Sequence, residues 1–268
     1  MKILVKLNLL YLLPTIGQKN YSLCMKIGVY GLGRFGSFWA ESLSGTGNEV
    51  IAYSRSKHTP PNGVRIAGEE EVLNSDLLFF SVAISSFEDV LEKVGKKIGK
   101  NTIAMDTCSV KKYPMEWMEN NIPGDIYTIG THPMFGPDSG KNGLVGLPVV
   151  MCPMKEIDNR YKKVKDLFLS MGLKVIEMTG DDHDRDAAFS QGVTHFIGRV
   201  LKEMNLEEKE IATKGYISLL EIVEQTCHDP LQLFYDLQRY NPYTRDMRHA
   251  LRIALENVGY RLENGEKA

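Results

Sequence analysis

A glycine-rich turn constrains this chain more than any other feature of its sequence. The turn, residues 31–36, reads Gly-Leu-Gly-Arg-Phe-Gly; it directly follows an apolar run at 27–30 and opens a helical pattern at 34–43. In such a turn the glycines allow a tight bend, close approach of a pyrophosphate, and packing of helix on strand. The unpaired N–H groups of the helix N-terminus favour the anion. We therefore predict a dinucleotide site, with a turn that serves only backbone geometry as the alternative; its residues are Gly31, Gly33, Arg34, Phe35 and Gly36.

Short apolar runs alternate with helix-length segments between residue 25 and about residue 180. Strands separated by helical patterns indicate βαβ units and a mainly parallel sheet. After residue 180 apolar residues recur only at helical spacing, at 189–204 and 247–262. The predicted fold is α/β, with an N-terminal Rossmann-type dinucleotide-binding domain at 25–180 and a C-terminal all-helical domain at 181–268. The predicted strands are 27–30, 50–53, 77–82, 102–105, 126–129, 148–151 and 173–178, and the predicted helices include 34–43, 87–98 and 157–171.

Residues 1–24 stand apart from the rest of the chain. They contain three lysines and no acidic residue, and their apolar stretch at 3–13 is interrupted by Lys6 and Asn8. The stretch is therefore too short and too broken to span a bilayer. Because a strand begins directly after Met25, we expect 1–24 to be a dispensable leader or the product of an upstream start codon, with a targeting segment as the alternative.

Composition excludes several classes of partner. Lys plus Arg total 32 against 34 Asp plus Glu, a net charge of -2, so the chain has no overall positive field for nucleic acid or an anionic membrane. Its four cysteines include no C-x-x-C pair, which argues against structural zinc and a disulfide framework. We therefore expect a cytoplasmic protein that binds a small molecule, without metal, nucleic acid or membrane.

The end of the second predicted strand indicates which dinucleotide fits. An NAD-binding domain places Asp or Glu about 20 residues after the glycine-rich turn, where it binds the ribose 2′-hydroxyl. This chain instead carries Ser54, Arg55 and Ser56, without a carboxylate. An arginine between two hydroxyls can form charge-assisted hydrogen bonds to a 2′-phosphate. We predict NADP rather than NAD at these residues, with a solvated polar turn as the alternative.

A second group of polar residues follows later strands. Pro133 restricts His132 to an extended backbone, and open α/β sheets bind ligands at the carboxyl ends of their strands. The segment 106–111, Asp-Thr-Cys-Ser-Val-Lys, also ends a strand. A structural histidine and a solvated helix face are the alternatives for these features. One predicted helix adds a stripe at four-residue spacing: Gln191, His195 and Arg199.

These segments together resemble the prephenate/arogenate dehydrogenases of tyrosine biosynthesis, and most closely the plant-type arogenate branch. The resemblance extends from Met25 to about residue 255. Its most specific part is the run His-Pro-Met-Phe-Gly-Pro-Asp-Ser-Gly-Lys at 132–141. It also rests on residues 31–36, 54–56, 106–111, 190–195 and 213–216.

The resemblance implies oxidative decarboxylation of a cyclohexadienyl ring, in which C4 gives hydride to the nicotinamide and the ring carboxylate leaves as CO2. By match to the family's motif, His132 is the base that takes the C4 hydroxyl proton, a role that suits a neutral imidazole. Ser109 matches the serine that hydrogen-bonds and orients this imidazole. His195 matches a histidine that lines the substrate cleft from the helical domain, and Gln191 and Thr194 are assigned to the same cleft.

Substrate choice rests on fewer residues. Arogenate carries an ammonium group where prephenate carries a keto group, so a nearby acid favours arogenate. Asp229 resembles the acidic position of arogenate-selective members, although an Asp before Pro230 also fits an N-cap of the next helix. We find no match to the arginine that binds the substrate carboxylate in many bacterial prephenate enzymes, which leaves Lys214 and Arg199 as candidates.

Three further features have structural interpretations. The acidic run 181–186 resembles a metal cluster, but its place before a helix fits capping and dipole stabilisation better. Phe35 and Trp39 are expected to pack onto the sheet. The broad apolar faces of the C-terminal helices, together with the resemblance, predict a homodimer.

Two other functional classes stay open. Another NADP-dependent reductase, of the hydroxyacid or imine type, would share the glycine-rich turn and the helical domain but would leave residues 131–141 unexplained. A non-catalytic NADP-binding protein would keep the turn and Arg55 without turnover.

Overall fold

The computed structural model describes residues 24–265 of the 268-residue chain. The interpretation of residues 1–24 therefore falls, apart from Cys24, outside the described residues. The elements up to the last strand are β1 (Lys26–Tyr30), α1 (Arg34–Ser44), β2 (Glu49–Tyr53), β3 (Val64–Ile66), α2 (Glu69–Leu73), β4 (Leu77–Phe80), α3 (Ile84–Val94), the 3₁₀ turn η1 (Gly95–Lys97), β5 (Ile103–Asp106), α4 (Lys112–Asn121), β6 (Tyr127–Pro133), α5 (Pro137–Gly140), β7 (Pro148–Pro153), α6 (Asn159–Ser170) and β8 (Lys174–Glu177). Only helices follow: α7 (Gly180–Ala187), the π-helical turn η2 (Ala188–Gly192), α8 (Val193–Glu203), α9 (Lys214–His228), α10 (Leu231–Tyr240) and α11 (Thr244–Glu263).

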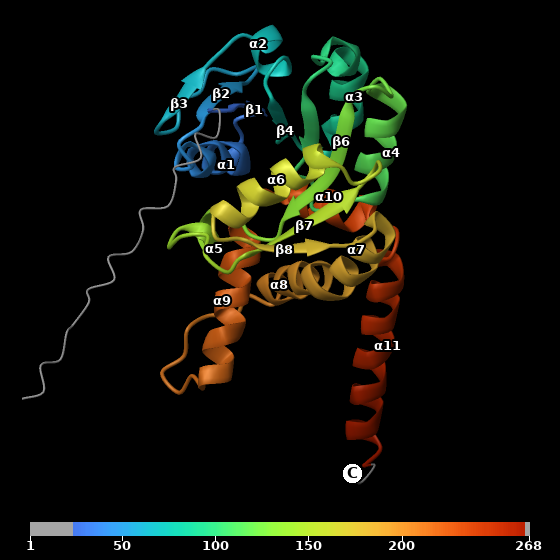
Figure 1. Cartoon of the computed structure of the whole chain (residues 1–268). Coiled ribbons are helices and arrows are strands. Elements are labelled where there is room, and N and C mark those ends of the chain that lie inside the picture. The colour runs from blue at the N-terminus through green and yellow to red at the C-terminus, as the bar shows by residue number, and fades with distance from the viewer. Residues whose placement is uncertain (1–23, 266–268) are drawn as a thin grey trace, which may run out of the picture.

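The strands form one sheet in the order β3-β2-β1-β4-β5-β6-β7-β8 (Figure 1). Neighbouring strands are parallel except β6 and β7, which are antiparallel. The apolar character of the strands requires cover on both faces of such a sheet, and helices supply it. The predicted α/β fold, a Rossmann-like sheet followed by C-terminal helices, is confirmed.

Aromatic side chains fill the core on the face covered by α1 and α6. Trp39 is fully buried, meets the ring of Phe79 edge-on at a centroid distance of 5.6 Å, and contacts Phe168. Phe35 stacks on Trp39 at 6.0 Å. The prediction that these two residues of α1 pack onto the sheet is confirmed. This packing fixes α1, and with it the turn at its N-terminus, against the strands.

The opposite face is covered by α3 and α4 and by part of the helical region. Phe87 of α3 packs between Phe80 and Trp117. Leu237 of α10 is buried in the same apolar cluster, so the helical region shares a core with the sheet. In Figure 1, α11 runs away from the rest of the fold toward the C-terminus. None of the helices within 24–265 is long and apolar enough to cross a membrane.

The structure differs from the predicted elements in one place that matters for function. The strand predicted at 126–129 continues as β6 to Pro133, because β7 returns antiparallel and pairs His132 with Val150. His132 therefore lies inside a strand rather than in the loop beyond it. The short elements β3 and α2 and the helix α4 were absent from the predicted set.

Candidate active site

The glycine-rich turn joins β1 to α1 and is shaped for close backbone approach. Gly31 has a φ of +107°, and a Cβ there would lie 2.4 Å from the carbonyl oxygen of Ser81. A Cβ at Gly36 would lie 2.1 Å from the carbonyl oxygen of Gly31, whereas one at Gly33 would meet nothing within 4 Å. The N-terminus of α1 has no side-chain cap and no acid in its first turn. The turn thus fits a pyrophosphate at Gly33, where free N–H groups and open space coincide.

The predicted ribose-binding segment lies beside this turn. The backbone N–H of Gly31 donates a 2.8 Å hydrogen bond to the carbonyl of Tyr53, the last residue of β2. Ser54, Arg55 and Ser56 follow directly, and Arg55 is exposed. Within residues 24–265, Arg55 forms no ion pair. Its guanidinium is therefore available to an anionic ligand at the turn.

Arg34, in contrast, has two carboxylate partners. Its guanidinium donates hydrogen bonds of 2.5 Å to Asp138 of α5 and 2.8 Å to Asp229. Asp229 follows α9, and the N-cap of α10 is Pro230, without a side-chain hydrogen bond. The alternative interpretation of Asp229 as a helix N-cap is therefore wrong. The carboxylate instead connects the helical region to the glycine-rich turn.

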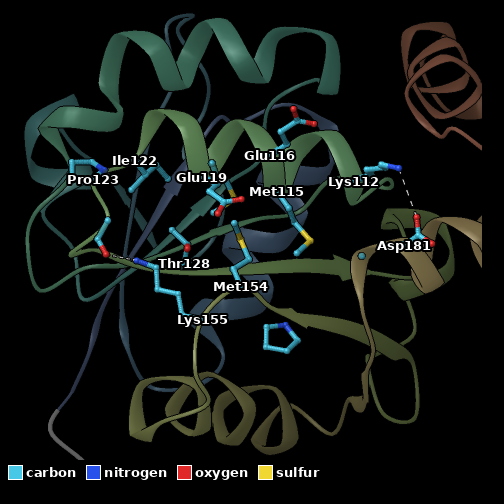
Figure 2. Close-up of a pocket in the computed structure, with 14 residues that line it drawn as sticks. Lys112, Met115, Glu116, Glu119, Ile122, Pro123, Thr128, Met154, Lys155 and Asp181 are labelled. Carbon is cyan, nitrogen blue, oxygen red and sulfur yellow. Dashed lines mark hydrogen bonds and ion pairs between the residues drawn. The ribbon is translucent and has the colours of Figure 1, made fainter.

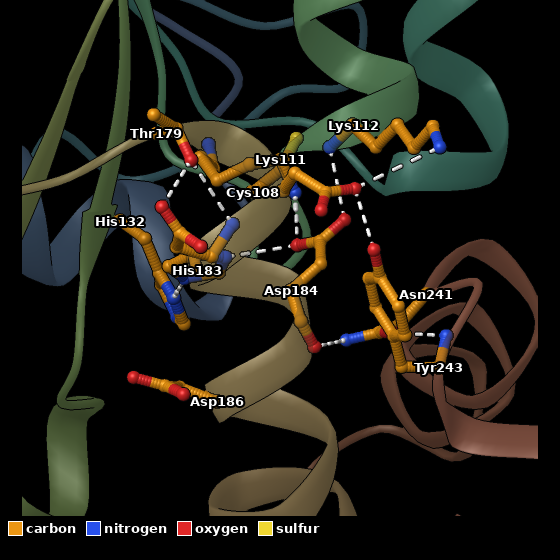
Figure 3. Close-up of polar contacts among 12 residues, drawn as sticks. Cys108, Lys111, Lys112, His132, Thr179, His183, Asp184, Asp186, Asn241 and Tyr243 are labelled. Atoms are coloured by element: carbon orange, nitrogen blue, oxygen red, sulfur yellow. Dashed lines mark hydrogen bonds and ion pairs between the residues drawn. The ribbon is translucent and has the colours of Figure 1, made fainter. Parts of the chain in front are cut away.

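His132 begins a chain of buried hydrogen bonds (Figure 3). Its Nδ1 lies 2.9 Å from Nε2 of His183, and Nδ1 of His183 lies 2.8 Å from Oδ1 of Asp184. The backbone N–H groups of Lys111 and Lys112, at the start of α4, donate to Asp184 at 2.7 and 2.9 Å. The side chains of His132, His183 and Asp184 are all buried, with exposed fractions of 3, 2 and 0 %.

The electrostatic surroundings keep His132 uncharged at neutral pH. Burial lowers the pKa of His132 well below its usual value, and His183, Lys111 and His195 lower this pKa further. An imidazole with this environment is neutral at pH 7 and can accept a proton. His195 therefore lies close enough to His132 to influence its charge.

Ser109 does not make the contact that the family resemblance implied. In the described structure its Oγ is buried without any hydrogen-bond partner, and the Nδ1 of His132 is bonded to His183 instead. The expectation that Ser109 orients His132 by a hydrogen bond is therefore wrong for this structure. The hydroxyl is free to bind a ligand.

Several residues of the predicted site carry buried polar atoms without a hydrogen bond. Of the six buried side-chain polar atoms that lack a hydrogen bond within 24–265, four belong to predicted or candidate site residues. Buried polar groups are otherwise nearly always paired, so these four atoms indicate a ligand position. They are Ser109 Oγ, Gln191 Oε1, His195 Nδ1 and Arg199 Nε.

The helical side of the site is held together around His195 of α8. Burial lowers the pKa of His195; Asp229 opposes this effect, and Arg199 adds to it. Arg199 also donates to the backbone oxygens of Thr226 and Asp229 at 3.1 and 3.0 Å. These contacts bring His195, Arg199 and Asp229 into one group. Gln191 joins them from the π-helical turn before α8, a feature that often occurs at functional sites.

Two predicted substrate-binding residues are placed differently. The Thr194 hydroxyl donates to the backbone oxygen of Ser190 at 2.9 Å, so it is already used within its helix. Lys214 is exposed and starts α9, whereas Asp229 follows the other end of this 15-residue helix. At about 1.5 Å per residue the two lie roughly 20 Å apart, so the structure does not bring Lys214 to the group around His195.

The segment 106–111 has a structural role besides carrying Ser109. Lys111 is fully buried; its ammonium pairs with Asp106 and donates a 2.6 Å hydrogen bond to the backbone oxygen of Thr131. Asp106 in turn accepts the backbone N–H of Thr131 at 2.9 Å. The ion pair therefore fixes the end of β5 against β6, next to His132.

A separate pocket of about 550 Å³ lies between α4, β6, β7 and α7. Its two lysines are already paired, since Lys112 contacts Asp181 (Figure 2) and Lys155 donates to two backbone oxygens. None of the predicted catalytic, substrate-binding or cofactor-binding residues lines it. We therefore do not place the active site there.

His183 and Asp184 were missed as site residues, because the acidic run was interpreted as a helix start. The run lies within α7 rather than before it: Thr179 caps the helix by accepting the backbone N–H of Asp182, and the dipole interpretation fits only Asp181 and Asp182 in the first turn. His183 and Asp184 belong to a stripe of buried residues at helical spacing, which also contains Gly180 and Ala187. This spacing is the sequence signal that could have identified them. Polar residues on such a stripe face the interior and need buried partners.

The fold and these contacts define a dinucleotide-binding protein of the dehydrogenase type, with a buried neutral histidine on the sheet that also carries its cofactor turn. Residues 42–177 match the family model described as prephenate dehydrogenase, nucleotide-binding domain, and residues 200–268 match the TYRAAT1-like, C-terminal domain. The chain belongs to the prephenate/arogenate dehydrogenase family.

Two plant proteins illustrate the relationship. The chain is 36 % identical over 249 residues to arogenate dehydrogenase 2, chloroplastic, of Arabidopsis thaliana, which covers 88 % of this chain and 70 % of that protein. It is 35 % identical over 254 residues to arogenate dehydrogenase 1, chloroplastic, of the same plant, covering 90 % of this chain but only 40 % of the relative. The chain thus spans less than half the length of this second relative.

A solved structure shares the fold. The crystal structure of prephenate dehydrogenase from Aquifex aeolicus, in complex with hydroxyphenyl propionate and NAD+, superposes with a TM-score of 0.70 at 18 % identity. The superposition covers 90 % of this chain and 91 % of that one. At this identity the match supports the fold and not the details of the site.

Proposed function

We propose that this protein catalyses the oxidative decarboxylation of arogenate, with prephenate as the alternative substrate, in tyrosine biosynthesis. The products are tyrosine (or 4-hydroxyphenylpyruvate), CO2 and NADPH. The observation that carries the proposal is the neutral, buried His132, which His195 approaches closely enough to affect its pKa, on the sheet that also holds the dinucleotide turn. The printed names of the two Arabidopsis relatives support the choice of arogenate.

In this proposal each residue has a separate task. Bound NADP+ supplies the acceptor for the hydride that leaves C4. His132 accepts the proton of the C4 hydroxyl at Nε2, which has no hydrogen bond within the described residues, and its neutral form is ready for this step. Ser109, Gln191 and His195 orient the substrate through their unpaired atoms.

The substrate side chain is the proposed ligand of the helical region. Asp229 pairs with the ammonium group of arogenate through Oδ2, since Arg34 occupies Oδ1. Arg199, whose Nε lacks a partner, binds the neighbouring carboxylate. We thus favour Arg199 over Lys214 as the carboxylate-binding cation, because Lys214 starts the far end of α9.

We propose NADP as the preferred dinucleotide. Arg55 is an exposed cation without an ion pair at the ribose end of the turn, and Ser54 and Ser56 add hydroxyl donors. The Aquifex aeolicus structure contains NAD+, so the preference rests on the residues of this chain. In the same proposal residues 25–180 form the cofactor domain, and residues 181–268 contribute the substrate side and the dimer contact.

We also propose a homodimer formed through the helical region. The second half of α11 exposes several large apolar side chains, among them Leu255, Val258, Tyr260 and Leu262, on a helix that extends away from the fold (Figure 1). A second copy would cover this surface. Light scattering during size-exclusion chromatography tests this, since a monomeric mass at micromolar concentration contradicts it. The four cysteines are free thiols, which supports a reducing compartment, the cytoplasm in this proposal.

One assay tests the activity. Formation of NADPH and release of CO2 are followed with arogenate and then prephenate, each with NADP+ and with NAD+. We expect turnover of both ring substrates, fastest with arogenate and NADP+. If neither ring substrate is oxidised with either dinucleotide, the proposed activity is wrong.

A further inference from the structure

We propose that His183 and Asp184 are a positioning pair, which holds His132 in the single neutral tautomer whose Nε2 is free of hydrogen. The catalytic meaning of this pair rests on the proposed function above. The tautomer is inferred from the hydrogen bonds of this protein with one hydrogen on each of the two imidazoles, and it can be measured without any substrate.

The argument starts at Asp184, which can only accept. Its Oδ1 and Oδ2 receive the backbone N–H groups of Lys111 and Lys112, two donors that cannot change direction. An ionised carboxylate with these partners accepts from any third group. Nδ1 of His183, at 2.8 Å, must therefore carry the hydrogen of that bond.

The next bond fixes His132. A His183 ring that carries its single hydrogen on Nδ1 presents a bare Nε2, which accepts. Nδ1 of His132 lies 2.9 Å away and must donate. A neutral imidazole carries one hydrogen only, so Nε2 of His132 is bare and can accept the substrate proton. The buried carboxylate thus determines, across an intervening imidazole, which nitrogen of the base is reactive.

The surroundings of His132 favour the neutral form of this ring. Besides burial, the groups that lower the pKa of His132 are His183, Lys111, whose ammonium pairs with Asp106, and His195. A protonated His183 would place an N–H against Nδ1 of His132 and force the hydrogen of His132 onto Nε2. Burial and the Lys111 charge oppose a resting cation at His132.

The pair also has a role after proton transfer. Once Nε2 of His132 has taken the substrate proton, the imidazolium donates from Nδ1 to His183, whose own Nδ1–H points at the carboxylate. Such a carboxylate-oriented histidine is stabilised as it becomes charged. No other group of the described chain bonds to the His132 ring, and Ser109 Oγ does not reach it.

Nitrogen NMR of the histidine side chains tests the tautomer directly. The protein contains six histidines, and the His132→Asn variant identifies the His132 signals by their loss. In the ligand-free protein at pH 7 we expect His132 to be neutral with hydrogen on Nδ1. A neutral His132 with hydrogen on Nε2, or a charged ring, overturns the inference whatever the enzyme does with arogenate.

Variants of His183 test the functional consequence. His183→Gln offers an amide oxygen where Nε2 stood, whereas His183→Leu offers no acceptor. We expect H183L to lower kcat by between about tenfold and ten-thousandfold, the range for a histidine that loses its orienting group. H183Q should recover at least about a tenth of the wild-type kcat, with KM for substrate and NADP+ within about twofold of wild type in both.

Asn241→Ala is the matched control. Asn241 is buried and donates to the backbone oxygen of Asp184 at 2.7 Å, but it does not touch the His132 or His183 rings. We expect N241A to lower thermal stability and to leave kcat and the His132 tautomer unchanged. Equal kcat losses in H183L, H183Q and N241A would indicate a purely structural role and overturn the inference. The wild-type spectrum decides the tautomer even if H183L does not fold.

Failure of this inference differs from failure of the proposed function. Without turnover of arogenate or prephenate the proposed function is wrong, while the wild-type spectrum still confirms or excludes the tautomer. With turnover and hydrogen on Nε2 of His132, only the positioning pair is wrong.

Discussion

Arg34 and Asp229 are 195 residues apart in the sequence, yet their side chains form an ion pair of 2.8 Å. Arg34 belongs to the glycine-rich turn that fits the cofactor, and Asp229 follows α9 beside the group around His195. The same guanidinium also pairs with Asp138 of α5. One cation therefore links the proposed cofactor site to the acid proposed to select the substrate.

Asp229→Asn should change substrate choice. Loss of the carboxylate removes the proposed partner of the arogenate ammonium and leaves prephenate unaffected, so we expect kcat/KM for arogenate relative to prephenate to fall by roughly tenfold or more, as for a charge-assisted hydrogen bond. Steady-state kinetics with both substrates measure this ratio. Asp138→Asn is the control, because it removes the other carboxylate of Arg34 and should leave the ratio unchanged. An equal change in both variants would show that the effect passes through Arg34.

His132→Asn should remove most of the activity and retain the cofactor site. Without a general base the expected loss of kcat is about a hundredfold to ten-thousandfold. The affinity for NADP+, measured by fluorescence or calorimetric titration, should stay within about twofold, because the turn at Gly31–Gly36 is held by separate contacts. Unchanged turnover would remove His132 from the mechanism.

Activity should persist to a lower pH than it would with a histidine of ordinary pKa as the base. The base must be neutral to act, and burial lowers the pKa of His132, so its neutral form persists at lower pH than in a free imidazole. We expect kcat/KM to stay level from pH 8 down to 6.5 and to fall only below that, where the ring becomes protonated. An acid limb with its midpoint at or above 6.5 would contradict this environment.

The free energy of unfolding should also decrease at low pH because of His132. Between the lowered pKa of folded His132 and the ordinary pKa of the unfolded chain, the unfolded state binds more protons, so unfolding becomes easier as pH falls below about 6.5. Denaturant unfolding at pH 7.5 and 5.5, in the wild type and in His132→Asn, measures the effect. The variant should lose less stability across this interval than the wild type does.

Arg55→Ala should weaken NADP+ more than NAD+. The guanidinium is the proposed ligand of the 2′-phosphate, so its loss should raise KM for NADP+ by roughly tenfold or more and leave KM for NAD+ within about twofold. Arg65→Ala is the control, since Arg65 is also exposed but pairs with Glu49 and Glu71. A similar rise for both dinucleotides would contradict a 2′-phosphate site.

Lys111→Met should destabilise the fold strongly. The substitution leaves the fully buried carboxylate of Asp106 without its counter-ion, which typically costs about 3–5 kcal/mol of unfolding free energy. The double variant with Asp106→Asn should recover part of this loss, because the uncompensated charge is gone. Denaturant unfolding measures both. Arg252→Gln, which breaks the exposed pair with Glu256 on α11, should have no measurable effect.

Much of the fold was predictable because its signals are local. The apolar runs and the glycine-rich turn predicted β1, β2, α1, α3 and α6, since strand and helix periods and turn geometry depend on neighbouring residues. The extension of β6 to Pro133 was not predictable in this way. It depends on pairing with β7, whose Val150 lies 18 positions further along the chain.

The candidate site also combines residues that local sequence signals predict with residues that only the fold brings together. Gly31, Gly33 and Gly36 could be assigned roles from their spacing alone, and the structure places them as expected. The hydrogen-bond partner of His132 could not be predicted from spacing. His183 lies on α7, 51 residues later in the sequence, and only the tertiary fold brings it to β6. The family resemblance implied that Ser109 forms the hydrogen bond to His132. The run 181–186 nevertheless contains His183 and Asp184, which lie on the buried side of α7.

The antiparallel pairing of β6 with β7 has a consequence for how this enzyme family can change its specificity. It holds His132 in β6 by pairing with β7, whereas the cation proposed to recognise the substrate side chain lies on α8 and the proposed acid directly follows α9. The proposed proton acceptor thus lies in the sheet, and the residues proposed to recognise the substrate side chain lie in the helical region. New side-chain preferences can evolve by exchange of helix residues while the proton acceptor keeps its place in the sheet.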